Sequence, residues 1–467
     1  MSLIQRVVRL VPGGDFFRGA LMIVLGTGAA QLITVLSQPI VTRLYTPSDF
    51  GVLSVATSIL SVLVSITCLR YEFAIPLPAD NVEAANVVGL SLIVNVAMSL
   101  LTVVAVLLFG DWVLGLFHAE ALRPYILLFA LAQLGGGVTS TFINWAVRAK
   151  DYSGIAVNQL YQSITLVAVQ IGFGLIRFGA PGLVLGAVAG NVAGSSRLAR
   201  ASYRAEPEAF RKITVEGMRT AAIRYRRFPI FSSGSALLGS VGLRAPLLLL
   251  VAFYGTGVGG QYALAERLLY LPLTLVAGGV GHVFIAQAAR LAREESDALR
   301  KLFIRTTGIL AALALGPAIL IAILSPILFV PIFGTQWDQS GRFVATLVPM
   351  FYLAFVVTST GDILYILERQ RLHLVREILR LSGLGGSVLV AALLNLPPET
   401  SIVVLSVGGC ITYILYGVIS WRAITEHHPR PEWLAASAAE AASEAEASEA
   451  SAAAAAAETA EVHEVGW

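Results

Sequence analysis

The sequence predicts an all-α polytopic membrane protein, with twelve transmembrane helices in two six-helix lobes related by a pseudo-two-fold axis along the membrane normal. Composition, the length of the apolar segments and an internal repeat support this. The 467 residues are 56% hydrophobic and only 13% charged, with a mean hydropathy of +0.77. Soluble domains carry about 25% charged residues, and disordered chains have low hydrophobicity. Both classes are therefore excluded.

The apolar segments have the length that a bilayer requires. A membrane-spanning helix needs about 20 predominantly apolar residues, and no soluble core could bury twelve segments of this kind. The first half contains six, at roughly 19–42, 51–69, 84–109, 124–147, 153–176 and 179–196. The second half contains six more, at roughly 229–253, 261–286, 306–333, 343–367, 374–396 and 400–421.

Two pairs of short motifs relate the halves to each other. Tyr45–Gly51 follows the first predicted span and Tyr254–Gly260 follows the seventh, each with a tyrosine, five residues and a glycine. Val138–Thr141 and Val357–Thr360 both read Val-Thr-Ser-Thr, in the fourth and tenth spans. Six spans per half is an even number, so both halves have the same orientation in the membrane. Coincidence in apolar sequence remains the alternative.

The basic residues predict that both termini are cytoplasmic. With that topology the inner connections hold 25 Lys and Arg and the outer loops hold four, as the positive-inside rule requires. The predicted parts are a cytoplasmic N-terminal segment (1–18), an N-lobe (19–196), a basic cytoplasmic linker (197–228), a C-lobe (229–422) and an acidic Ala/Ser/Glu-rich cytoplasmic tail (423–467). The linker is expected to attract anionic phospholipids.

Charged side chains inside spans are costly and usually functional. Guanidinium groups suit phosphate because they offer planar bidentate donors and keep their charge. We therefore expect a cavity for an anionic headgroup, with substrate-binding candidates Arg244, Arg267, Glu266, Arg70 and Arg380. The candidates for ion coupling are Glu72 and Asp362. Structural ion pairs, Arg244 with Glu266 and Asp362 with Arg380, are the alternative.

The sequence contains no motif for enzymatic catalysis or for binding a nucleotide or metal. There is no Walker motif, metal-ligand spacing or nucleophile–base pattern, so we expect no enzyme activity, cofactor, metal or nucleic-acid partner. The sixth predicted span carries a repeated G-x-x-x-G pattern, which predicts close helix packing. Its members are Gly182, Gly186, Gly190 and Gly194.

Several segments together resemble one family. The sequence is similar to the bacterial oligosaccharide (O-antigen type) flippases of the polysaccharide exporter group. That group belongs to the superfamily that includes multidrug and toxin extruders and the lipid II flippase. The similarity covers about residues 20–425 and lies in Arg43–Gly51, Arg70–Pro78, Arg226–Pro229, Ala265–Pro272, Phe333–Trp337 and Leu367–Arg371.

The resemblance implies a function in surface polysaccharide assembly, such as lipopolysaccharide O-antigen or exopolysaccharide, in the bacterial inner membrane. A polyprenyl-diphosphate-linked oligosaccharide would move from the cytoplasmic to the periplasmic leaflet by alternating access, with a polysaccharide polymerase and glycosyltransferases as partners. A multidrug or small-molecule exporter of the same fold is the alternative, and it predicts a net-acidic cavity. A membrane polymerase or ligase needs a large extracytoplasmic loop, which this sequence lacks.

Overall fold

The computed structural model describes residues 15–273, 284–285, 287–289, 291–292, 296–361, 363–367 and 369–427. Every regular element in these ranges is helical, so the all-α prediction is confirmed. The coupling candidate Asp362 and residues 428–467, most of the predicted tail, lie outside the described residues.

The helices follow one another with short connections. The first half contains α2 (Asp15–Leu36), α3 (Gln38–Leu44), α4 (Pro47–Ser65), η1 (Tyr71–Ala74), α5 (Asn81–Leu116), η2 (Glu120–Tyr125), α6 (Leu128–Arg148), α7 (Tyr152–Leu175) and α8 (Ala180–Val192). The predicted linker forms three shorter helices, α9 (Ser195–Ala205), α10 (Pro207–Arg211) and α11 (Val215–Arg224). The second half contains η3 (Phe228–Ser232), α12 (Ser233–Pro272), α14 (Ser296–Phe333), η5 (Thr335–Trp337), α15 (Asp338–Gly361), α16 (Ile363–Ile366), α17 (Gln370–Arg380), η6 (Leu381–Gly385), α18 (Gly386–Leu393) and α19 (Pro398–Thr425).

The α12 segment is two helices joined by a reversal of the chain. Gly255 has φ 83° and ψ 170°, a backbone conformation that glycine adopts without steric cost. A Cβ atom placed on Gly259 would lie 2.1 Å from Cγ2 of Val251. Residues eight apart on a continuous helix are separated by about 12 Å, so the chain must fold back at Gly255.

Each predicted span overlaps a helix of the structure. Six stretches of the described residues are long and apolar enough to cross a membrane, namely Pro47–Ser65, Asn81–Leu116, Phe228–Pro272, Asp297–Phe333, Thr335–Ile366 and Pro398–Thr425. Phe228–Pro272 contains the reversal at Gly255 and therefore overlaps two predicted spans. The full set of twelve spans stays a prediction.

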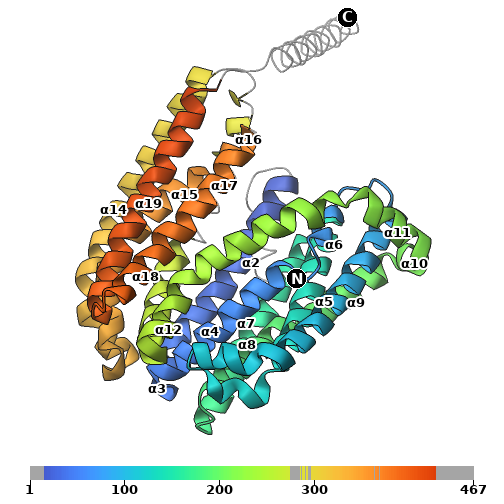
Figure 1. The fold of residues 1–467 in the computed structure, drawn as a ribbon. Coiled ribbons are helices and arrows are strands. Elements are labelled where there is room, and N and C mark those ends of the chain that lie inside the picture. The colour runs from blue at the N-terminus through green and yellow to red at the C-terminus, as the bar shows by residue number, and fades with distance from the viewer. Residues whose placement is uncertain are drawn as a thin grey trace, which may run out of the picture.

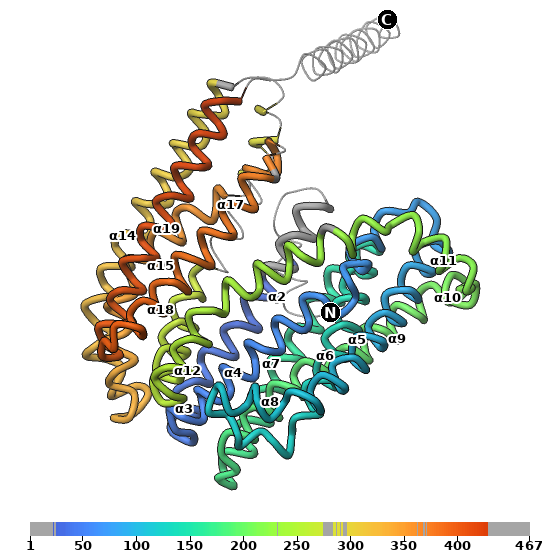
Figure 2. The backbone as a smooth tube through the Cα atoms, in the orientation of Figure 1, coloured from blue at the N-terminus to red at the C-terminus, as the bar shows by residue number. Residues whose placement is uncertain are grey.

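The helices form two groups that converge at one end of the molecule (Figures 1 and 2). The first group contains α2 to α9 with η1 and η2, and the second contains α14 to α19 with η5 and η6. The α12 segment lies where the groups meet, against α4 on one side and α15 and α18 on the other. We call the converging end, where α3 lies, the α3 end, and the diverging end the α11 end.

The two repeated motifs contact each other at the α3 end. A Cβ atom on Gly51 would lie 1.9 Å from the carbonyl oxygen of Thr256, and one on Gly260 would lie 1.7 Å from that of Pro47. The hydroxyl oxygens of Ser48 and Thr256 are 2.6 Å apart. The backbones of α4 and α12 therefore touch at two glycines that occupy equivalent places in the repeat.

Hydrogen bonds from the loop after α14 close the same end. Trp337 is fully buried, and its Nε1 donates to the carbonyl oxygen of Thr42 at 3.0 Å. Gln336 donates to the same carbonyl at 2.7 Å, while Gln261 donates to the carbonyl of Gln336 at 2.6 Å. The rings of Phe50 and Trp337 meet edge to face at 4.9 Å. Segments from both groups are thus joined by buried polar contacts.

The glycine pattern on α8 packs against α7, as predicted. A Cβ atom on Gly186 would lie 2.4 Å from Cγ of Gln170, and one on Gly190 would lie 2.9 Å from Cβ of Leu166. Small residues at this spacing let helix backbones approach closely.

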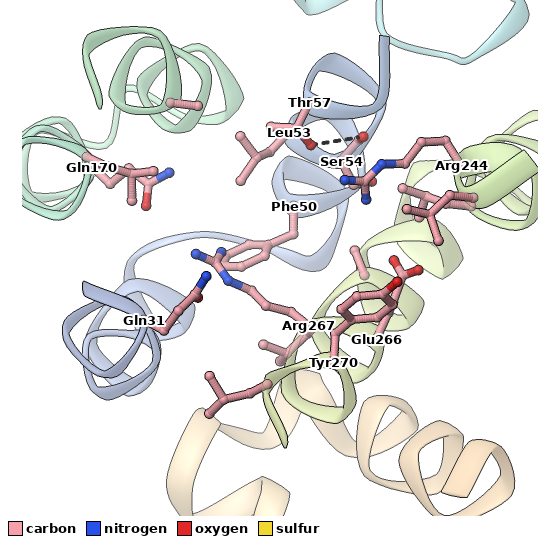
Figure 3. Close-up of a pocket in the computed structure, with 17 residues that line it drawn as sticks. Gln31, Phe50, Leu53, Ser54, Thr57, Gln170, Arg244, Glu266, Arg267 and Tyr270 are labelled. Atoms are coloured by element: carbon pink, nitrogen blue, oxygen red, sulfur yellow. Dashed lines mark hydrogen bonds between the residues drawn. The ribbon is translucent and has the colours of Figure 1, made fainter. Parts of the chain in front are cut away.

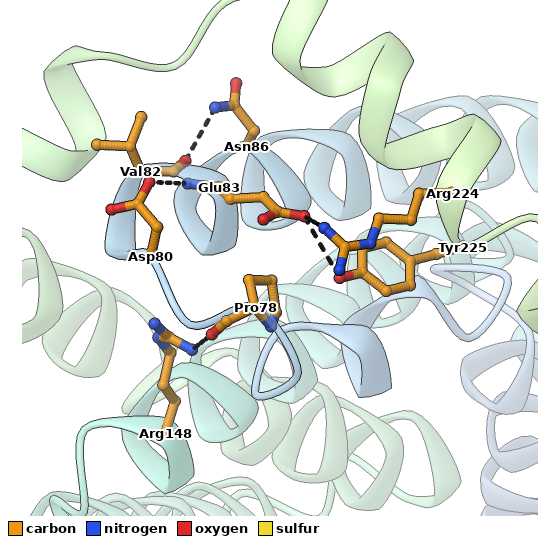
Figure 4. Close-up of polar contacts among 8 residues, drawn as sticks. All are labelled: Pro78, Asp80, Val82, Glu83, Asn86, Arg148, Arg224 and Tyr225. Atoms are coloured by element: carbon orange, nitrogen blue, oxygen red, sulfur yellow. Dashed lines mark hydrogen bonds and ion pairs between the residues drawn. The ribbon is translucent and has the colours of Figure 1, made fainter.

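The linker is folded onto the first group at the α11 end (Figure 4). Arg224 of α11 forms an ion pair with Glu83 of α5, with 2.5 Å between Nη1 and Oε1. The backbone N–H of Thr214 donates to Oδ1 of Asn86 at 2.9 Å. Arg148 donates to the carbonyl of Pro78, which holds the loop before α5. The chain therefore enters α12 from a segment fixed to the first group.

The glycine contact predicts a specific loss of stability. G51A and G260A should each lower the free energy of unfolding by about 1–3 kcal/mol, because the added methyl group overlaps backbone atoms. Thermal unfolding of purified protein in detergent, followed by tryptophan fluorescence, measures this. G257A is the matched control, since its Cβ atom would meet nothing within 4 Å. An equal loss in G257A would contradict close packing as the cause.

Candidate functional site

A cavity of about 310 Å³ lies between the first helix group and the α12 segment (Figure 3). Helices α2, α4, α7 and α12 supply its polar and aromatic lining, which includes Gln31, Phe50, Ser54, Thr57, Gln170, Arg244, Glu266, Arg267 and Tyr270. We call it the deep cavity. It contains three of the substrate-binding candidates that the sequence predicted.

The two arginines reach the deep cavity from opposite arms of the α12 hairpin. Arg244 precedes the reversal at Gly255 and Arg267 follows it. In Figure 3 the Arg244 side chain extends toward Ser54 of α4, whereas Arg267 extends toward Gln31 of α2. The hairpin therefore brings both guanidinium groups to one cavity.

Neither arginine of the deep cavity is neutralised by an ion pair. Within the described part of the chain, no carboxylate oxygen lies within 4.0 Å of a side-chain nitrogen of Arg244 or Arg267. Nε of Arg244 is buried and has no hydrogen-bond partner there. The structural pairing of Arg244 with Glu266 is therefore not formed, although both residues line the same cavity. Two partly buried guanidinium groups that face one cavity without an ion-pair partner mark a candidate ligand site.

A second and wider cavity of about 810 Å³ shares Leu243 with the first. Its lining comes from η1, from the beginning of α12 and from α16 and α17, and includes Arg70, Phe73, Phe228, Ser232, Ser235, Tyr365, His373, Glu377 and Arg380. We call it the vestibule. Tyr71 of η1 donates to the carbonyl oxygen of Ala222 in α11, and the lining of the vestibule includes the start of α12, which follows α11 in the chain. The vestibule therefore lies on the α11 side of the deep cavity.

Arg380 lines the vestibule but is already paired. It forms an ion pair with Glu377 and donates to the carbonyl oxygen of Gly239 at 3.0 Å. Nε2 of His373 lies 4.0 Å from the other oxygen of Glu377. The sequence suggested Asp362 as a partner of Arg380 and did not single out Glu377. The i, i+3 spacing of Glu377 and Arg380 on a helix is the sequence feature that could have indicated this ion pair.

Arg70 and Glu72 point to different environments. Arg70 lines the vestibule, with its guanidinium carbon 4.8 Å from the centroid of the Phe73 ring. Glu72 lines neither cavity, is 3% exposed, and its Oε2 has no hydrogen-bond partner among the described residues. Burial raises the pKa of Glu72, while the nearby charge of Arg70 acts in the opposite direction. Glu72 is therefore a buried acid beside the vestibule.

The comparisons with known proteins give the family. The family described as "Polysaccharide biosynthesis protein" matches residues 40–342. The chain belongs to this family. The succinoglycan biosynthesis transport protein ExoT of Rhizobium meliloti (strain 1021) is 23% identical over 319 residues, which cover 67% of this chain. The match spans 60% of that relative's length.

Solved transporters share the fold. An inward-facing multidrug resistance MATE family transporter of the MOP superfamily aligns with a TM-score of 0.63 at 14% identity, over 91% of this chain and 98% of that one. The lipid II flippase MurJ in an inward closed conformation gives 0.58 at 13% identity, over 87% and 91%. An outward-facing MATE family transporter gives 0.52 at 14% identity, over 91% and 98%.

The family match and ExoT confirm the predicted resemblance to polysaccharide exporters, and the solved structures show a shared fold. The protein is a multi-pass membrane protein of the polysaccharide biosynthesis family with a transporter fold. The named relatives are transport proteins and a flippase, which agrees with the expectation that the chain is not an enzyme. At identities near 14%, the structural likeness shows a shared fold and does not indicate the substrate. The substrate has to be inferred from the residues that line the cavities.

The open vestibule predicts a difference in chemical accessibility. In a background with Cys68 and Cys410 replaced by alanine, S235C should react with a hydrophilic maleimide, because Ser235 is exposed and lines the vestibule. S340C should stay unreacted, because Ser340 is fully buried at the α3 end. Mass spectrometry of the detergent-purified protein measures both. Similar labelling of the two positions would contradict closure of the α3 end.

Proposed function

We propose that the protein is a flippase that moves a polyprenyl-diphosphate-linked oligosaccharide from the cytoplasmic to the periplasmic leaflet of the bacterial inner membrane. The observation that carries the proposal is the pair of arginines without an ion-pair partner in the deep cavity between the first helix group and the α12 segment. A diphosphate supplies the acceptor oxygens that two guanidinium groups can bind bidentately. The family's association with polysaccharide biosynthesis supports a glycan cargo.

Glu266 adjusts the charge of the deep cavity in this proposal. With Arg244 and Arg267 it leaves one net positive charge among the lining residues. An anion is then attracted but can also leave, which a transport site requires. Gln31 and Tyr270 offer further hydrogen bonds to the headgroup.

Alternating access supplies the route. The α3 end is closed by the glycine contact and by the hydrogen bonds of Gln336 and Trp337, while the vestibule opens toward the α11 end. The basic linker at the α11 end favours a cytoplasmic location for that end. In this orientation both termini are cytoplasmic and the conformation is inward-facing. The two lobes would then rock about the cavity to expose it to the periplasm.

Glu72 and Asp362 remain the proposed coupling sites. Burial favours the protonated form of Glu72, so a proton could bind and leave as its surroundings change. The proposed partners are anionic phospholipids at the linker, together with a polymerase and glycosyltransferases that handle the glycan. Lobes at 19–196 and 229–422 are the proposed moving units.

A multidrug exporter of the same fold is the second candidate, favoured by the TM-score of 0.63 to such a transporter. That likeness concerns the fold alone. A site for cationic drugs needs net negative charge, whereas this deep cavity carries two arginines and one glutamate. The lining therefore favours an anionic cargo.

Removing either deep arginine should abolish transport. R244A and R267A should each lower surface polysaccharide at least about tenfold, because a hydrogen bond to a charged group contributes about 1.5–3 kcal/mol. Quantitative glycan staining of whole cells measures this, with immunoblots to equalise the amount of protein in the membrane. R219A is the control, since Arg219 is exposed on α11 and lines neither cavity. Unchanged surface glycan in R244A or R267A would contradict the assignment.

The orientation gives a separate prediction. V215C on α11 should react with a membrane-impermeant maleimide in inside-out vesicles and stay protected in intact cells with a permeabilised outer membrane. E120C, exposed at the opposite end in η2, should show the reverse pattern. Both variants are made without Cys68 and Cys410. Labelling of V215C in intact cells would overturn the cytoplasmic placement of the α11 end.

A further inference from the structure

The vestibule differs from the deep cavity in size and in lining. Its volume is about 810 Å³ against about 310 Å³, and the two chambers meet at Leu243. If the diphosphate occupies the deep cavity, the part of the cargo that extends toward the α11 end must lie in the vestibule. The larger chamber has the room that several sugar rings need.

Exposed aromatic rings line the vestibule from both helix groups. Phe73 of η1 is 45% exposed and Tyr365 of α16 is 56% exposed. The Tyr365 ring lies 4.4 Å from that of His373, centroid to centroid. Aromatic faces offer flat apolar surfaces on which the C–H face of a sugar ring packs, and tyrosine adds a polar tip. This combination of rings and hydroxyl groups suits a glycan.

The charges of the vestibule leave one cation uncompensated. Glu377 is paired with Arg380, and His373 also lies beside Glu377. Among the described lining residues, Arg70 is the charged side chain that has no oppositely charged atom within 4.0 Å. Glu72 is close enough to feel the charge of Arg70 but forms no ion pair with it. The vestibule therefore presents one available guanidinium group.

The backbone that presents Arg70 is strained. Arg70 has φ 64° and Leu69 has φ 47°, so two successive residues with side chains adopt the left-handed region. This conformation is sterically unfavourable for residues with a Cβ atom and persists where the surroundings enforce it, often at ligand sites. In this backbone conformation the Arg70 side chain lines the vestibule, with its guanidinium group over the Phe73 ring.

We propose that the vestibule binds the glycan of the cargo and that Arg70 selects glycans carrying a carboxylate, such as uronic acids. The inference rests on the proposed function and adds the chemical class of the sugar. The carboxylate accepts two hydrogen bonds from the guanidinium group of Arg70, and the sugar ring packs on Phe73 or Tyr365. A neutral glycan leaves Arg70 unpaired and binds more weakly.

Binding measurements on the full chain in phosphatidylcholine nanodiscs test the proposal. The probes are trigalacturonate, its neutral methyl ester and inorganic diphosphate, each measured by microscale thermophoresis. Wild-type protein should bind trigalacturonate about tenfold more tightly than the ester, the difference expected for one charge-assisted hydrogen-bonded pair. R70N should lose this preference, because asparagine tolerates the left-handed backbone but carries no charge. R70K keeps the charge and should retain part of the preference.

The probes distinguish a failure of the proposed function from a failure of the proposed role of Arg70. Diphosphate should bind wild type and R70N equally and should fail to bind R267A. Absence of diphosphate binding to wild type would overturn the proposed function itself. Normal diphosphate binding, together with equal affinities for trigalacturonate and its ester, would overturn only the role of Arg70. R177N is the control for a general effect of surface charge, because Arg177 is exposed, has φ 56° and lines neither cavity. A lost preference in that variant would also overturn the proposal.

Discussion

The close approach of α4 and α12 at Gly51 and Gly260 is the constraint on which the rest of the structure depends. Any side chain at either glycine would overlap backbone atoms of the other helix. Because the helices touch there, Trp337 and Gln336 can reach the carbonyl of Thr42 and join the second group to the first. The same contact closes one end of the molecule and leaves the other end to diverge.

The position of the deep cavity follows from that contact. Arg244 and Arg267 lie eleven residues before and twelve residues after Gly255, so each is about 17 Å along its helix from the reversal. The hairpin therefore sets both guanidinium groups at one depth, beyond the closed end. The Gly255 conformation and the Gly51–Gly260 contact together place two cations where the helix groups begin to separate.

The sequence predicted the helices well because segment length and hydropathy are local properties. It also indicated Arg244, Glu266 and Arg267 as cavity candidates, because charged side chains within apolar segments are costly and usually functional. It did not predict that the repeated motifs touch, because contacts between distant segments depend on packing. It did not indicate the pairing of Arg380 with Glu377, because charged residues at i, i+3 spacing are also common on exposed helix surfaces. The left-handed backbone at Arg70 has no sequence signal, since neither Leu69 nor Arg70 favours it.

The unpaired arginines also explain how closure could depend on cargo in the proposed mechanism. In the proposed inward-facing conformation, water that enters through the vestibule would solvate Arg244 and Arg267. Closing the α11 end would remove that water and leave two guanidinium groups with Glu266 as the single acid in the lining. Uncompensated buried charge costs several kcal/mol per ion. A bound diphosphate supplies the missing negative charge, so the loaded protein can close where the empty one cannot.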